Sequence, residues 1–115
     1  MKRILPISLM LSCFATAQAA ELKLSGPEIQ NVLTDKTLFG TDHNQPAEQI
    51  FQKSGATFYS SGGSQSQGAW KIEGDKYCSQ WPPNQAWPCY DVTKDGDKIT
   101  FISASGARTE MSLVK

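Results

Sequence analysis

The chain has 115 residues, with 11 basic and 11 acidic side chains, and this length indicates a single domain. Without residues 1–19, which are discussed next, 9 basic and 11 acidic side chains remain and the net charge is −2. That charge argues against a nucleic-acid-binding protein and against a polybasic membrane-binding patch. The core of such a domain is small, so a covalent crosslink would add useful stability.

The N-terminus has the three-part pattern of a secretory signal peptide. A basic start at Met1 to Arg3 precedes a mostly apolar run from Ile4 to Phe14, and Ala17 and Ala19 form a small-residue cleavage site. The apolar run is too short for a spanning helix, and the residues before Cys13 match a lipoprotein signal poorly. We therefore expect a signal peptide over residues 1–19, a mature domain over residues 20–115, and a periplasmic or secreted location without a membrane span.

The mature chain keeps two cysteines, Cys78 and Cys89, and an even number in an oxidising compartment favours a disulfide. In the chain-entropy model, such a bridge stabilises the fold by about 2–3 kcal/mol. A structural zinc site usually needs four ligands, and His43 is the one other soft ligand in the mature sequence. A redox-active pair normally has the spacing C-x-x-C, which is absent. We expect a structural disulfide and no metal.

The mature chain begins with the signals of a short helix. Ser25 is a suitable N-cap, and Glu28 at the third helical position completes a capping box. An apolar stripe follows at Ile29, Val32 and Leu33, which is the spacing of one helix face. The pattern predicts a helix over residues 26–34 that packs on another element, because so short a helix is unstable alone.

After the helix, the apolar period changes to two, which predicts strands. Residues 40–47 are polar, residues 61–68 are rich in Gly, Ser and Gln, and we expect loops in both places. A two-residue turn at Ser54-Gly55 would place Phe51 opposite Phe58 as a cross-strand aromatic pair. The predicted strands cover residues 37–39, 48–53, 56–60, 69–73, 76–81, 88–93, 98–103 and 109–115.

Strands that follow one another through short turns pair as antiparallel neighbours. The sequence therefore predicts a mainly β fold, a small antiparallel up-and-down meander or barrel of about eight short strands. One short N-terminal helix would cover an end or an open face of it. The alternative is a β-sandwich.

The segment around the two cysteines predicts its own register. If Cys78 lies opposite Cys89 on antiparallel strands, then Tyr77 lies opposite Tyr90, and Lys76 lies opposite Asp91. Successive side chains alternate between the two faces of a sheet. The tyrosines would then point into the core, and the disulfide would lie on the outer face beside the Lys76–Asp91 pair.

The loop between the cysteines contains two tryptophans and is rich in proline. Tryptophan is enriched in binding hot spots, so the candidate contact residues are Trp81, Asn84, Gln85 and Trp87. The alternative is that both indoles fold back over a small core. Trp70 lies in a clean alternating segment, and we expect it in the core.

The sequence lacks the usual groups of catalytic sites. His43 is the single histidine, beside Asp42 in a polar segment, and no serine lies in a G-x-S-x-G motif. Asp42, His43 and Glu48 match no metal-ligand spacing, and the Gly-rich segment lacks the lysine and helix of a phosphate-binding loop. We expect no enzyme activity, no catalytic residue and no cofactor.

Four short motifs occur in order along the mature chain: a helix region at Leu24–Leu33, Thr-x-x-Gly at Thr37–Gly40, Gly-x-Trp at Gly68–Trp70, and Cys-x-x-Trp…Cys from Cys78 to Cys89. This order resembles a family of small exported bacterial proteins of unknown function. The resemblance covers residues 22–105; it implies a periplasmic β-domain and carries over no catalytic residue. One departure is Ser54-Gly55, where such proteins would have an Asp-Gly turn.

These features favour a monomeric, non-enzymatic binding module that contacts a protein or an envelope component through the Trp/Pro-rich loop. One alternative is a lipocalin-like carrier of a small apolar ligand, with a barrel lined by Phe58, Trp70 and Phe101. Another is an enzyme inhibitor that inserts the Cys78–Cys89 loop into its target.

Overall fold

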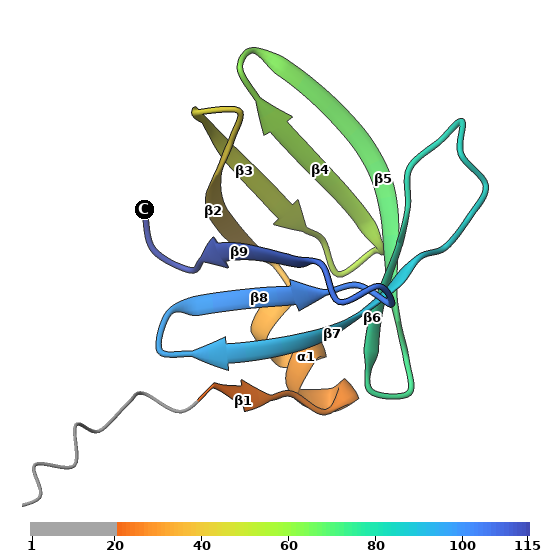
Figure 1. Ribbon diagram of the computed structural model, residues 1–115. Coiled ribbons are helices and arrows are strands. Elements are labelled where there is room, and N and C mark those ends of the chain that lie inside the picture. The colour runs from red at the N-terminus through yellow and green to blue at the C-terminus, as the bar shows by residue number, and fades with distance from the viewer. Residues whose placement is uncertain (1–20) are drawn as a thin grey trace, which may run out of the picture.

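A computed structural model describes residues 21–115 (Figure 1). The predicted signal peptide, its cleavage site and Cys13 lie outside the described residues. Within residues 21–115, no helix is both long enough and apolar enough to cross a membrane. The elements are β1 (Leu22–Lys23), α1 (Gly26–Leu33), β2 (Lys36–Asp42), β3 (Gln45–Phe51), β4 (Ala56–Ser61), β5 (Ser64–Glu73), β6 (Lys76–Gln80), β7 (Cys89–Asp95), β8 (Lys98–Ile102) and β9 (Arg108–Ser112).

Eight of the strands close into an antiparallel barrel. From β2 to β9, each strand pairs with the next one along the chain, and β9 returns to β2, where Ser112 lies opposite Phe39. The short β1 lies outside this circle and pairs with β7. The predicted mainly β, up-and-down barrel with an N-terminal helix is confirmed, and the sandwich alternative is wrong.

α1 begins where the capping box predicts. The backbone N–H of Glu28 donates to Ser25 Oγ at 3.4 Å, and the Ser25 N–H donates to Glu28 Oε1 at 2.9 Å. The helix ends at Leu33, one residue earlier than predicted. Ile29 and Leu33 are fully buried, so the helix closes one end of the barrel with its apolar stripe (Figure 1).

The core lies at the α1 end and in the middle of the barrel, around Phe51. The Phe51 ring makes edge contacts with Trp70 and Tyr77, at centroid distances of 5.7 and 5.8 Å, and stacks on Phe101 at 6.4 Å. Trp70 is buried as predicted, and its indole N–H donates to the Gln52 carbonyl at 2.9 Å.

The β3–β4 register differs by one residue from the predicted one. Phe51 lies opposite Thr57, and Ile50 lies opposite Phe58, so the predicted Phe51–Phe58 pair is wrong. The turn is longer than two residues: the Gln52 N–H donates to the Ala56 carbonyl at 2.9 Å, and Gly55 has a φ of +96°. A one-residue slip reverses the faces of a strand, so Phe51 enters the core while Phe58 points outward.

Both segments predicted as loops are hairpins. β2 continues to Asp42 and turns at His43 and Asn44, which have φ values of 47° and 65°. β4 turns into β5 at Gly62 and Gly63, with φ values of 54° and 84°. Positive φ at both central residues is the geometry of tight hairpin turns. The β4–β5 hairpin extends away from α1 (Figure 1), so its polar residues lie at the open end of the barrel.

The docking of α1 on the β5–β6 turn generates a stability prediction. The Gly26 N–H donates to Asp75 Oδ1 at 2.7 Å, and a Cβ at Gly26 would lie 2.1 Å from the Gly74 carbonyl oxygen. Gly26→Ala should therefore lower the free energy of unfolding by about 1–3 kcal/mol, measured by urea denaturation.

The matched control is Gly40→Ala, because a Cβ at Gly40 has its nearest neighbour, Met111 Cε, at 3.5 Å. Its stability should change by less than about 1 kcal/mol. Equal stability of the two variants would contradict close docking of the helix.

Candidate functional site

Two adjoining hollows lie at the open end of the barrel, opposite α1. The outer hollow has a volume of about 620 Å³, and the inner hollow has about 140 Å³. Gln49, Tyr59 and Trp81 line both, so the two hollows adjoin at these three residues, which are called the passage below. The outer hollow is further lined by Gln65, Ser66, Gln67 and Pro82, and the inner one by Tyr77, Ser79, Tyr90, Phe101, Thr109 and Met111.

Trp81 reaches this passage because β6 places it on the inner face, two residues after Ser79. Its indole N–H donates to Ser79 Oγ at 3.2 Å, and its ring lies edge-on to Tyr59 at 6.5 Å. Gly68 on β5 makes room for the indole, since a Cβ there would lie 2.8 Å from Trp81 Cε3. Gly68, the glycine of the Gly-x-Trp motif, therefore leaves space for the indole of Trp81 on the neighbouring strand.

Gln49 and Tyr77, which both line the inner hollow, belong to a hydrogen-bonded group of uncharged side chains. Gln49 Nε2 donates to Thr57 Oγ1 at 3.1 Å and to the Tyr77 hydroxyl at 3.3 Å. Thr57 Oγ1 in turn donates to the Ile50 carbonyl at 2.9 Å. Burial raises the pKa of Tyr77 to about 12, so this hydroxyl is neutral at physiological pH.

The rim of the barrel carries the single histidine. The Tyr59 hydroxyl donates to Asp42 Oδ2 at 3.1 Å, and burial together with Asp42 raises the pKa of Tyr59. His43 Nδ1 lies 2.7 Å from Asp42 Oδ1, with 95% of the His43 side chain exposed. Glu48 pairs instead with Lys115 at 3.8 Å. Within residues 21–115, Asp42, His43 and Glu48 form no group of converging metal ligands.

The four residues predicted as contacts do not share one face. Trp81 lines the hollows, whereas Trp87 lies on the outer surface, with Lys71 Nζ 4.3 Å from its ring centroid. Asn84 and Gln85 are exposed at the tip of the loop. The Asn84 N–H donates to the Trp81 carbonyl and its side chain accepts the Ala86 N–H, both at 3.0 Å. The loop is therefore an ordered turn whose two tryptophans lie on different faces, Trp81 at the hollows and Trp87 on the outer surface.

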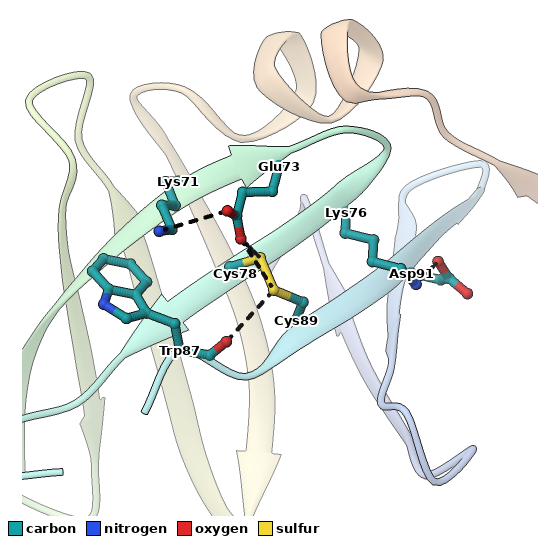
Figure 2. The surroundings of a disulfide bond; sticks show 7 residues. All are labelled: Lys71, Glu73, Lys76, Cys78, Trp87, Cys89 and Asp91. Carbon is teal, nitrogen blue, oxygen red and sulfur yellow. Dashed lines mark hydrogen bonds and ion pairs between the residues drawn. A yellow bond between two sulfur atoms is a disulfide. The ribbon is translucent and has the colours of Figure 1, made fainter. Parts of the chain in front are cut away.

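The cysteine hairpin has the predicted register and faces. Tyr77 lies opposite Tyr90 and Cys78 opposite Cys89, with an S–S distance of 2.00 Å. Lys76 Nζ lies 2.9 Å from Asp91 Oδ1 on the same outer face (Figure 2). The hydrogen bond from Lys76, together with the nearby charge of Lys23, lowers the pKa of Asp91.

Glu73 covers the disulfide from β5 (Figure 2). Its Oε2 lies 3.4 Å from Cys78 Sγ and 3.7 Å from Cys89 Sγ. These are contacts without hydrogen bonds, because disulfide sulfurs carry no proton. Cys78 is fully buried. During reduction of the disulfide, both the attacking thiolate of the reductant and the departing cysteine thiolate would be repelled by the Glu73 carboxylate. This arrangement is that of a structural bridge, and the bonded sulfurs offer no thiolate ligand to a metal.

Comparison of the chain with protein-family models, with curated proteins and with solved structures finds no match. The resemblance to small exported proteins stays a prediction.

The Glu73–disulfide contact predicts the rate of reduction. Glu73→Gln should speed reduction by dithiothreitol about fivefold, because one charge repulsion of about 1 kcal/mol is removed from the reaction. Intact-mass measurements over time give the rate. The control is Glu110→Gln, which removes an exposed charge paired with Lys98 at 3.7 Å, and it should react like the unmodified protein. Equal rates for all three proteins would contradict the shielding by Glu73.

Proposed function

We propose that the protein is an exported, non-enzymatic binding domain that contacts a protein or an envelope component at the open end of its barrel. The supporting observation is the asymmetry of the barrel interior. The α1 end is filled by the core around Phe51, whereas the opposite end holds the two hollows. Pockets of about 300–1,000 Å³ with a few placed polar groups are typical ligand sites.

The lining of the hollows supports binding rather than catalysis. The described residues that line them offer hydroxyl and amide groups, which bind a ligand by hydrogen bonds, and include no imidazole, ammonium or carboxylate group that would activate a hydroxyl as a nucleophile. The Cys78–Cys89 disulfide supports the proposed periplasmic or secreted location, because such bridges persist in oxidising compartments.

The interior gives less support to a lipocalin-like carrier. Of the three residues proposed to line its cavity, Trp70 is buried in the core and Phe58 points outward. Phe101 lines the inner hollow, but this hollow measures only about 140 Å³. A long apolar ligand would have to displace the core.

A second candidate is a protein contact, including enzyme inhibition, through the tip of the Cys78–Cys89 loop. The order of this loop favours it: Gln80 Nε2 donates to the Gln85 carbonyl at 3.0 Å, and Trp87 is held over Lys71. Asn84 and Gln85 would be its contact residues.

The two tryptophans separate these candidates. The oxidised protein, purified from the periplasm of an expressing bacterium, is screened against a fragment library by ligand-observed NMR. Fragments should bind the unmodified protein and Trp87→Ala alike, and bind Trp81→Ala at least about tenfold more weakly, as expected for an anchoring aromatic residue.

Melting temperature and intact mass confirm that each variant is folded and oxidised. If no fragment binds, or if binding depends on Trp87 and not on Trp81, the open-end site is wrong.

A further inference from the structure

The free edge of β5 borders the outer hollow. β5 runs over ten residues and β6 over five, and their last pair at this end is Ala69 with Gln80. β5 therefore continues through Ser64–Gly68 with β4 on one side and, among the described residues, no strand on the other. An unpaired strand edge is a template for pairing with another chain.

Pro82 explains why the β5–β6 ladder stops. In the β5–β6 register, the position after Trp81 would lie opposite Gln67. Proline has no N–H to donate to a ladder, so Pro82 cannot pair with Gln67. The chain leaves the sheet there, and Trp81 and Pro82 form the opposite wall of the outer hollow.

Alternation along β5 identifies the unpaired backbone groups. The Trp70 N–H donates to the Gly55 carbonyl at 2.9 Å, on the β4 side. In an antiparallel strand every second residue bonds to the same neighbour, so Ser66 and Gly68 bond to β4. The N–H and C=O groups of Gln65 and Gln67 then point to the free edge, and both residues line the outer hollow.

The side chains around this edge define what fits beside it. An added strand would alternate its side chains, and those on the inner face would enter the passage at Trp81, Tyr59 and Gln49. The described lining residues carry no formal charge, and a buried charge without a partner is costly. An uncharged side chain therefore fits there.

We propose that the open end binds an extended peptide segment, which adds to the free edge of β5 as a strand and places an uncharged side chain against Trp81 and Tyr59. This inference rests on the proposed function and names the class of its ligand. Backbone hydrogen bonds to Gln65 and Gln67 give the affinity, and the aromatic passage gives the selectivity, as in other strand-addition complexes.

The experiment uses short random peptides displayed on phage and selected against the oxidised protein. Enriched peptides are synthesised, and their affinities are measured by calorimetry. Gln67→Pro removes the edge N–H while Gln67→Ala keeps it, and neither changes the β4 side of the ladder. The peptides should bind Gln67→Pro about fivefold more weakly than Gln67→Ala, because both variants lack the glutamine side chain and only Gln67→Pro also lacks the edge N–H.

Three results would overturn this inference. One is that no peptide is enriched, and another is that the peptides bind Gln67→Pro and Gln67→Ala equally. The third is that neutral trisaccharides, titrated in parallel, bind the passage at Trp81 while peptides do not. In each case, fragment binding that still depends on Trp81 shows that the open-end site is right and only its ligand class is wrong.

Discussion

The pairing register of β6 with β7, in which Cys78 lies opposite Cys89, is the constraint on which the rest of the site depends. It directs Tyr77 inward and the disulfide outward, and by alternation it brings Trp81 to the open end of the barrel. It also places Pro82 where the ladder with β5 has to end. The same register therefore sets the aromatic passage, the free edge of β5 and the outward position of Trp87.

The two ends of the barrel differ in their inward residues: one end holds the apolar core, and the other holds the hollows. Towards α1 the interior is filled by aliphatic side chains and by the rings around Phe51, all part of one buried apolar cluster. Towards the open end the inward residues include the polar side chains of Gln49, Thr57 and Ser79, which are satisfied by hydrogen bonds to one another or to neighbours. The open end thus has an uncharged, hydrogen-bonded interior, which favours a preorganised binding site.

The sequence predicts those parts whose signals are local. The capping box at Ser25, the facing cysteines and the alternation around Trp70 each depend on a few neighbouring residues. The strands in residues 40–47 and 61–68 were missed because their residues are polar on both faces, which follows from their position at an open end. The Phe51–Phe58 register failed because Ser54-Gly55 is part of a longer turn. The hollows and the free edge depend on strand lengths and long-range pairing, which no local pattern contains.

Amide hydrogen exchange in the free, oxidised protein tests the central claim most directly, because it reports each backbone N–H of β5 separately. The N–H groups of Gln65 and Gln67 should exchange rapidly, whereas those of Ser66 and Gly68, which bond to β4, should be protected. Protection of all four would show that the edge is already covered, and would contradict a free template for a partner strand. Rapid exchange of all four would show that the β4–β5 hairpin is not formed at the open end.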